Sequence, residues 1–218
     1  MDLQYLKFEG FNLATQKGYK SFPSFKELTS TALTSACVGL HTQLSGTGTT
    51  NYAGDATKLY QMNSSLVFID KSKAGGYNNS TTEKSRDFWD FTQFGKRILA
   101  TNNADNIQSF VEGTSSAFAD LVSLKAKYVA TIREFVFAGY MTESGTEYSN
   151  RVRWSGINDP TTWTASQTTM SDFQDIPDAG NITGLVGGDF GVVLLERGIA
   201  RMQYVGSPLI FTFDMVET

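Results

Sequence analysis

Two residue types that commonly carry chemistry are almost absent from this sequence of 218 residues. It contains one cysteine, Cys37, and one histidine, His41. One cysteine excludes a disulfide within the chain, and this pair is too few for the Cys/His clusters that hold zinc. A nucleophilic serine or cysteine usually needs a histidine as its base, and only His41 is available. The sequence therefore predicts no enzyme, no metal site and no bound cofactor.

Cys37 and His41 lie four residues apart in a segment that alternates apolar and polar residues. In a strand this spacing places both side chains on one face. The favoured interpretation is a hydrogen-bonded strand histidine and a small buried cysteine, rather than a catalytic pair.

Positive charge and long apolar runs are also scarce. Lys and Arg number 18 against 22 Asp and Glu, a net charge of −4, whereas a protein that reads DNA needs a basic face. An acidic wall along which DNA slides without binding stays compatible with this balance. No run reaches the roughly 20 apolar residues that span a membrane, and the first residues lack the features of a signal peptide. We therefore expect no membrane insertion by this chain.

The residues that are abundant favour short strands joined by tight turns. Glycine occurs 20 times and aromatics make up 13% of the chain, while only 18% of residues are charged. This balance fits neither a helical bundle nor a disordered chain. Residues 1–28 contain scattered aromatics without a sustained period, and we expect an extended arm that packs on a neighbouring surface. From residue 29 onward the chain is a succession of strand patterns.

The stretch from residue 151 to Trp163 combines a strand with a corner. Residues 151–154 alternate basic and apolar side chains, which predicts a half-buried strand ending at Trp154. Asp159 and Pro160 then predict a turn through Asx hydrogen bonding and a fixed φ. We expect Trp163 to fold back onto Trp154, because a buried aromatic supplies the area that a short strand lacks. Such a corner is typical of the end of one β-propeller sheet, so the prediction is an architectural role.

Two Phe-Gly pairs mark a degenerate repeat. Phe94-Gly95 ends a segment that alternates aromatic and polar residues, and an apolar returning strand follows it. Phe190-Gly191 is followed by a similar apolar strand, and residues 133–139 occupy the intermediate place. A strand pair that recurs about every 40–50 residues is the period of propeller blades. A β-propeller is therefore favoured over a sandwich or an open sheet.

The predicted fold is all-β, with about four blades of antiparallel sheet in residues 29–218. Residues 115–127 have a helical spacing, but a connection between blades, held to the core by Phe118 and Leu121, is favoured over a helix. The last eight residues form an alternating strand without a following turn. We therefore expect an incomplete or open propeller, either because the sequence is the N-terminal part of a longer protein or because partner chains complete the fold.

Other charged residues give weaker signals. Paired carboxylates could serve a glycosidase, but a solvated acidic loop at residues 170–178 is favoured. The basic residues could form salt bridges at the rim of a subunit interface or contact nucleic acid. The carboxylates are Glu134, Glu143, Glu147, Asp172, Asp175 and Asp178, and the basic residues are Lys125, Lys127, Arg133, Arg151 and Arg153.

Three segments resemble, in the same order, the propeller of the tail hub or nozzle proteins of short-tailed bacteriophages. This family includes packaged-DNA stabilisation proteins and the second tail tubular protein. The segments are residues 89–102 with Asp105, residues 151–163 and residues 180–206. The motif residues expected to matter are structural, and no catalytic residue is carried across. They are Trp89, Phe94, Gly95, Trp154, Asp159, Pro160, Trp163, Phe190 and Gly191.

The resemblance implies a virion structural protein, synthesised in the host cytoplasm and located in the virion tail. It implies a homo-oligomeric ring, a hexamer, below the portal and next to the head–tail adaptor and other tail proteins. Genomic DNA would pass through the lumen without sequence-specific binding. Proteins of this family are usually much longer than this chain, which again favours a missing C-terminal part.

Two alternatives stay open. The first is a carbohydrate-binding or glycan-hydrolysing propeller, because residues 155–163 are faintly similar to turns of sialidase-like blades. In that case aromatics such as Tyr77, Tyr140 or Tyr148 would stack on sugars. The second is a scaffold that binds other proteins.

Overall fold

The computed structural model describes residues 29, 31–46, 48–78 and 88–217, together with the strand residues 11–15 and 18–21. The chain divides into two compact units, Met1–Thr31 and Ala32–Thr218. In the first unit, β1 (Phe11–Thr15) and β2 (Gly18–Ser21) pair as an antiparallel hairpin. The remainder of the arm predicted for residues 1–28 lies outside the described residues.

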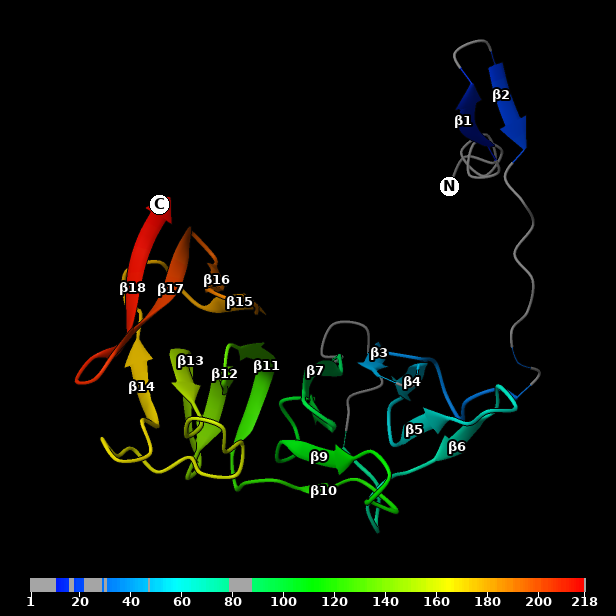
Figure 1. The fold of residues 1–218 in the computed structure, drawn as a ribbon, viewed down its shortest axis with the longest axis horizontal. Coiled ribbons are helices and arrows are strands. Elements are labelled where there is room, and N and C mark those ends of the chain that lie inside the picture. Colours follow the sequence, from blue (N-terminus) through cyan, green and yellow to red (C-terminus); the bar gives the residue numbers. More distant parts are fainter. Residues whose placement is uncertain are drawn as a thin grey trace. The chain divides into compact units, whose positions relative to one another are not determined.

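The second unit contains four antiparallel sheets, each built from four strands that follow one another along the chain (Figure 1). Blade 1 consists of β3 (Gly39–Ser45), β4 (Gly48–Gly54), β5 (Leu59–Met62) and β6 (Phe68–Asp70). Blade 2 consists of β7 (Asp90–Phe94), β8 (Arg97–Thr101), β9 (Gln108–Val111) and β10 (Ala119–Asp120). Blade 3 consists of β11 (Lys125–Ile132), β12 (Phe135–Glu143), β13 (Thr146–Trp154) and β14 (Asp172–Asp175). Blade 4 consists of β15 (Ile182–Val186), β16 (Gly191–Leu195), β17 (Gly198–Gly206) and β18 (Ile210–Glu217).

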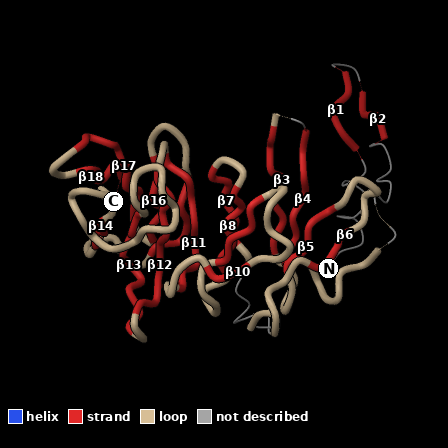
Figure 2. The backbone as a smooth tube through the Cα atoms, turned by 60° about the horizontal axis from the view of Figure 1, so that its bottom comes forward, coloured by secondary structure: helices blue, strands red, loops and turns tan. Residues whose placement is uncertain are grey.

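A four-stranded antiparallel meander is the blade of a β-propeller. The predicted all-β fold with about four such blades is therefore confirmed. Figure 2 shows strands and loops throughout the described residues. None of these residues lies in a helix long and apolar enough to cross a membrane.

Tight turns join neighbouring strands where the sequence supplies residues for positive φ. Gly95 has φ of 58° between β7 and β8. Ser144 and Gly145 have φ of 51° and 80° between β12 and β13, as a type I′ hairpin turn requires. These turns bring consecutive strands into register, so each blade forms from a local stretch of chain.

The first strand of each blade lies beside the first strand of the next blade. Thus β3 contacts β7, β7 contacts β11, and β11 contacts β15. In Figure 1 these four inner strands follow the concave side of an arc, and the later strands of each blade lie outside them. Within the described residues, β3 and β15 make no comparable contact with each other.

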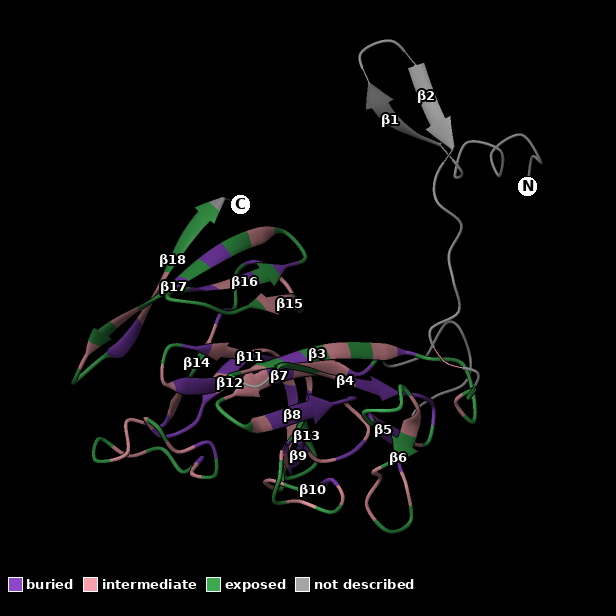
Figure 3. Ribbon diagram, turned by 45° about the vertical axis from the view of Figure 1, so that its right-hand side comes forward, coloured by how far each residue is buried: buried purple, intermediate pink, exposed green. Residues whose placement is uncertain are grey.

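Each junction between blades has its own apolar core. The core between blades 1 and 2 includes Tyr52, Leu59, Trp89, Ile98 and Phe110. The core between blades 2 and 3 includes Leu99, Val129, Val136, Met141 and Trp163. The core between blades 3 and 4 includes Phe137, Trp154, Val193, Met202 and Phe211. In Figure 3 strands such as β8 and β12 are buried along most of their length, because both faces of a blade between two neighbours are covered.

Residues 115–127 form a connection between blades, as predicted, with only the short β10 and the start of β11 as regular structure. Phe118 is 2% exposed in the core between blades 1 and 2. Leu121 packs on the next core. The acidic loop predicted at residues 170–178 is wrong in part, because Asp172–Asp175 forms β14 and pairs with β13. β14 is only four residues long and three of them are polar, so in sequence it resembles a loop.

Candidate functional site: the inner face of the blades

The inner strands of blades 2 and 3 are joined by side chains rather than by a backbone ladder. The Asp90 carboxylate at the start of β7 accepts a hydrogen bond from the Val129 N–H at 2.8 Å. Thr92 Oγ1 donates to Thr131 Oγ1 at 3.0 Å, and Thr131 Oγ1 donates to the Gln93 carbonyl at 2.8 Å. These bonds fix β11 beside β7 in a parallel orientation.

The same strand β7 is held to blade 1 by the side-chain amide of Gln93. Its Nε2 donates to the Leu44 carbonyl at 2.7 Å, and its Oε1 accepts from the Leu44 N–H at 3.0 Å. The amide group thus forms with Leu44 the two hydrogen bonds that the backbone of a neighbouring strand would form on this edge of β3. An edge strand with unpaired backbone groups can pair with other chains, and this amide caps part of that edge.

At the junction between blades 3 and 4, backbone hydrogen bonds join the end of β11 to the segment that follows β15. The Gly188 N–H donates to the Thr131 carbonyl at 3.1 Å, and the Arg133 N–H donates to the Gly188 carbonyl at 2.9 Å. A Cβ on Gly187 would lie 2.1 Å from the Thr131 carbonyl oxygen. Only glycine therefore allows this close approach of two main chains.

A hollow of about 450 Å³ opens on this inner face, between β7, β11 and the segment that follows β15. Its walls carry Asp90, Thr92, Gln93 and Thr131, and none of its lining residues is basic. Burial raises the pKa of the Asp90 carboxyl to about 6, although the Val129 and Phe91 N–H groups favour its charged form. The inner face near this hollow is therefore neutral to weakly acidic.

Lysines on the inner strands lie away from the hollow. Lys125 and Lys127 are in the first half of β11, before the residues that line it. The Lys127 ammonium is 5.3 Å from the centre of the Tyr140 ring and 5.9 Å from that of Tyr128. The predicted basic region is therefore divided, because Arg151 and Arg153 are on β13, two strands further out.

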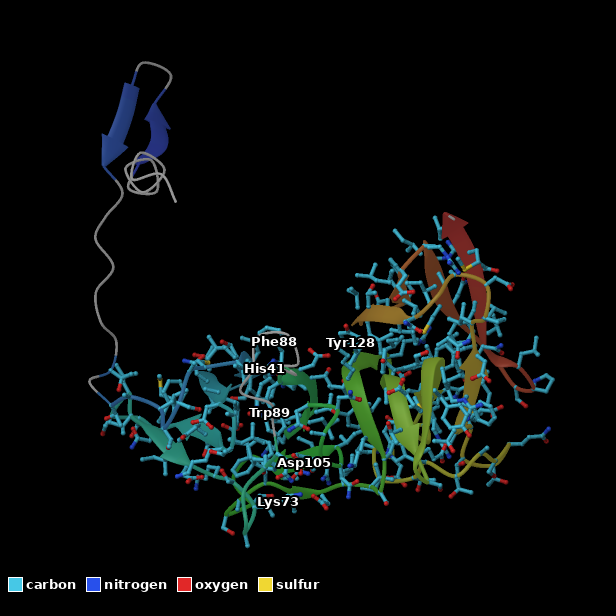
Figure 4. The ribbon with its side chains drawn as sticks, turned by 180° about the vertical axis from the view of Figure 1, so that it is seen from behind. His41, Lys73, Phe88, Trp89, Asp105 and Tyr128 are labelled. Carbon is cyan, nitrogen blue, oxygen red and sulfur yellow. The ribbon has the colours of Figure 1, made fainter. Side chains whose placement is uncertain are left out.

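Trp89 connects blade 1 to blade 2. Its indole is 4% exposed, and its Nε1 donates to the Asp55 carbonyl at 2.8 Å. Gly39 and Gly54 leave room for it, since a Cβ on Gly54 would lie 2.2 Å from the indole ring. Figure 4 shows Trp89 beside β7, close to His41 of β3. These two glycines of blade 1 therefore provide the space that the Trp89 indole occupies.

The predicted turn at Asp159 and Pro160 is present. Asp159 accepts hydrogen bonds from the hydroxyls of Thr161 and Thr162, at 2.5 and 2.6 Å, and from the Thr161 N–H at 2.9 Å, and these bonds lower the pKa of its carboxyl. The Trp163 Nε1 donates to the Pro160 carbonyl at 2.8 Å. Hydrogen bonds among residues 159–163 therefore hold this turn in place.

The prediction that Trp163 folds back onto Trp154 is wrong. Trp154 packs against Phe137 and Phe211 in the core between blades 3 and 4. Trp163 lies in the core between blades 2 and 3. The loop after β13 crosses the edge of the sheet, so the two indoles end on opposite faces of blade 3.

The two Phe-Gly pairs both lie where the first and second strands of a blade are connected, but their residues have different roles. Phe94 ends β7 and packs on a core, and Gly95 supplies the turn. Phe190 is 56% exposed. Gly191 begins β16, where a Cβ would lie 2.3 Å from Ile132 and 2.4 Å from Met202.

Several residues weighed for chemistry have structural partners. His41 stacks on Phe91 with ring centres 5.9 Å apart, and burial lowers its pKa. Cys37 is exposed and precedes β3, so the predicted buried cysteine on the same strand is wrong. Tyr77, considered for sugar stacking, is 4% exposed and packs on Trp89.

The carboxylates near blade 3 are paired with arginines. Arg151 forms a two-point ion pair with Asp175, at 2.6 and 2.9 Å, which lowers the pKa of that carboxyl. Its guanidinium lies between the rings of Tyr148 and Phe173, 3.8 and 4.1 Å from their centres. Arg153 pairs with Glu143. Among the described residues no three His, Cys, Asp or Glu side chains gather in a way that could hold a metal ion.

The sequence reasoning missed Asp90, Thr92 and Thr131, which join the inner strands. A signal was present in the alternation Asp90-Phe91-Thr92-Gln93, where short polar residues stand between aromatics on a strand that must be buried. Polar residues on such a strand need partners, so they point to a neighbouring strand edge.

The sequence matches no protein-family model. No curated protein sequence is similar to it. One similar solved structure is the crystal structure of BBS1N in complex with ARL6DN, soaked with lead, with 10% sequence identity and a TM-score of 0.47. The similarity covers 90% of this chain and 57% of that one, so this chain spans less than two thirds of that structure's length.

Proposed function

We propose that this protein is a structural subunit of a bacteriophage tail, in the hub or nozzle ring through which the genome leaves. The subunit holds DNA back until ejection and then conducts it. The ring is a hexamer below the portal, in contact with the head–tail adaptor and other tail proteins. The protein is made in the host cytoplasm and is located in the virion tail.

The observation that carries this proposal concerns the residues shared with the tail hub and nozzle family. Trp89, Trp154 and Trp163 each donate an indole N–H to a backbone carbonyl outside the strands, and each is buried at a blade junction. The residues that carry the resemblance are thus residues that fasten blades together. Contacts that hold blades together would make a wall rigid, and they are not groups that carry out a reaction.

The chemistry of the inner face supports the same proposal. Around its hollow the inner face carries threonine, glutamine and one carboxylate, and no lysine or arginine. Tight DNA binding needs several cations that replace phosphate counterions. The residues around the hollow therefore favour passage of a duplex over tight binding.

The experiment is localisation in the virion. In a phage that encodes this chain, gold-labelled antibody against blade 4 should mark the tail of purified particles, and removing the gene should give heads that lose their packaged DNA. Absence of the chain from purified virions would contradict the proposal. Purified protein should also fail to retard duplex DNA at about 150 mM salt, and sequence-specific retardation would contradict the conduit role.

A carbohydrate-binding or glycan-hydrolysing propeller remains the second hypothesis. The corner at residues 155–163 uses its Asp159 carboxylate for Thr161 and Thr162, so that group is engaged within the loop. Binding on a glycan array, lost on substitution of Tyr140 or Tyr148, would favour this hypothesis over the tail ring.

A further inference from the structure

The three blade junctions of this chain follow one construction. Each blade has a leading face, which meets the preceding blade, and a trailing face, which meets the following blade. The cores between blades 1 and 2, 2 and 3, and 3 and 4 are each formed by a trailing face against a leading face. Two faces have no neighbour of this kind among the described residues: the leading face of blade 1 and the trailing face of blade 4.

The leading face of blade 1 exposes leucines on its inner strand. Leu40 and Leu44 of β3 are 65% and 69% exposed. They alternate with His41, which points the other way and stacks on Phe91 of blade 2. The Leu40 and Leu44 side chains therefore point away from the junction between blades 1 and 2.

The trailing face of blade 4 is apolar in its inner part. Val186 of β15 is paired with Val192 of β16, and Leu194 of β16 with Ile199 of β17, so these four side chains share one face. Val186 is 52%, Leu194 36% and Ile199 37% exposed. On the opposite face of the same strands, Val193 and Ala200 are fully buried against blade 3.

Closure within one chain does not cover these faces, because β3 and β15 make no contact comparable with the three junctions. Among the described residues, the one leading face without a preceding blade is that of blade 1. We propose that a second copy of this chain supplies it, so that two chains join blade 4 to blade 1 twice and close an eight-bladed ring.

The size of the faces agrees with this closure. Four strands about 4.8 Å apart and about six residues long cover roughly 380 Å². Two junctions with two faces each would bury at most roughly 1,500 Å², which is within the range of stable complexes. The value is an upper bound because Ala53 and Tyr60, on the same face as Leu40, are already 1% and 5% exposed. Eight blades also lie within the range of known propellers, which is roughly four to eight. Each junction joins two different faces, and a two-fold axis relates the two junctions, so the pair closes without leaving a free face.

This inference does not rest on the proposed tail function, because it concerns only the faces of blades 1 and 4 that have no neighbouring blade. The test uses the full chain of 24.0 kDa in sedimentation velocity from about 1 to 200 µM. The expected species is a pair of twice that mass. A monomer throughout this range would overturn the proposal.

Two double variants test which faces meet. Leu40→Glu with Leu44→Glu blocks the leading face, and Leu194→Lys with Ile199→Lys blocks the trailing face. Each alone should weaken pairing by roughly 100-fold or more, because a charge is desolvated without a partner at both junctions. The control is Leu66→Glu, an exposed leucine in the turn between β5 and β6, which should pair like the wild type.

A mixture of the two double variants tests whether a leading face meets a trailing face. The mixed 1:1 pair has one wild-type junction and one junction in which glutamates of the leading face meet lysines of the trailing face, so the mixture should pair although neither variant does so alone. Pairing that survives either double variant alone, or a mixture that stays monomeric, would overturn the proposal. Because all four residues are exposed, an unchanged circular dichroism spectrum is expected for both variants, and their melting temperature should fall only by the stabilisation that pairing gives the wild type.

Discussion

At the scale of single residues, the three tryptophans solve one problem in the same way. Trp89, Trp154 and Trp163 bury a large ring in a core and direct the indole N–H to a carbonyl of a connecting segment. A buried N–H without a partner would be unfavourable, and a connecting segment has carbonyls that no strand uses. One side chain therefore supplies apolar area to a blade junction and also fixes the loop beside it.

Replacing Trp154 by alanine should lower the free energy of unfolding by about 3–5 kcal/mol. The side chain is 2% exposed and contacts Phe137, Phe211 and Phe213, so its loss leaves a cavity. Urea denaturation followed by circular dichroism measures the change. Trp154→Phe is the control, since it keeps a ring and loses the bond to the Met170 carbonyl, and it should cost about 1–2 kcal/mol. Normal stability of the alanine variant would refute the structural role.

Asp90 should make stability depend on pH in a direction opposite to that of a salt-bridged carboxylate. Burial raises its pKa in the folded chain to about 6, from 3.8 in the unfolded chain. Between these values the folded state holds more protons, so stability contributed by Asp90 is present below about pH 4 and is lost as pH rises to 6. Asp90→Asn should therefore stabilise the protein at pH 7.5 and not at pH 4.

The gain for Asp90→Asn should be about 1 kcal/mol, less than the roughly 3 kcal/mol that the pKa difference alone allows. The amide keeps an acceptor for the Val129 N–H but gives a weaker bond than a carboxylate does. Urea denaturation at both pH values measures it. Asp214→Asn, at an exposed position, is the matched control and should show no such gain. A stabilisation of equal size at pH 4 and pH 7.5 would rule out this explanation.

At the scale of elements, a few hydroxyl and amide groups hold the first strands of neighbouring blades together. Each first strand pairs with another strand of its sheet along one edge only, so its other edge faces no further strand of that sheet. Thr131 is central, since its hydroxyl accepts from Thr92 and donates to the Gln93 carbonyl, while its own carbonyl accepts from Gly188. One residue of β11 thus contacts the inner edges of the blades on both sides.

Thr131→Val should cost about 1–2 kcal/mol, because it keeps the shape and leaves two partly buried groups of β7 without their partner. Thr131→Ser retains the hydroxyl and should cost clearly less. Hydrogen exchange should show faster exchange of β7 and β11 amides in the valine variant. Equal stability of the valine and serine variants would show that the methyl group, and not the hydroxyl, holds these strands.

The strands were predictable from sequence, and their partners across blades were not. The alternation at residues 89–94 and the glycine at position 95 are local patterns, and β7 and β8 lie where they predict. The direction of Trp163 depends on how the loop after β13 crosses the sheet edge, which no local pattern encodes. Asp90 meets Val129, and Thr92 meets Thr131, only because the chain between the members of each pair, which are 39 positions apart, forms a blade, so the inner face required the fold itself.

At the scale of the whole molecule, the blades behave as a short array in which each one contacts only its neighbours. The cores at the first and third junctions share no residue and are separated by the core between blades 2 and 3. In such arrays stability is close to a sum of unit and neighbour terms. Sites without shared partners usually have additive effects within about 0.5 kcal/mol.

Trp89→Phe and Trp154→Phe should therefore be additive when combined. Trp89→Phe removes the indole hydrogen bond to the Asp55 carbonyl, and Trp154→Phe removes the one to the Met170 carbonyl. Each also removes some buried apolar area, and the two losses fall at different junctions. Urea denaturation of both single variants and the double variant gives the interaction energy. Phe137→Leu with Trp154→Phe is the contrast, because those two rings stack with centres 5.6 Å apart and should be coupled by more than about 0.5 kcal/mol. Strong coupling between Trp89 and Trp154 would mean that the blades transmit packing changes along the whole arc. The blades would then behave mechanically as one stiff wall, and not as a chain of independent junctions.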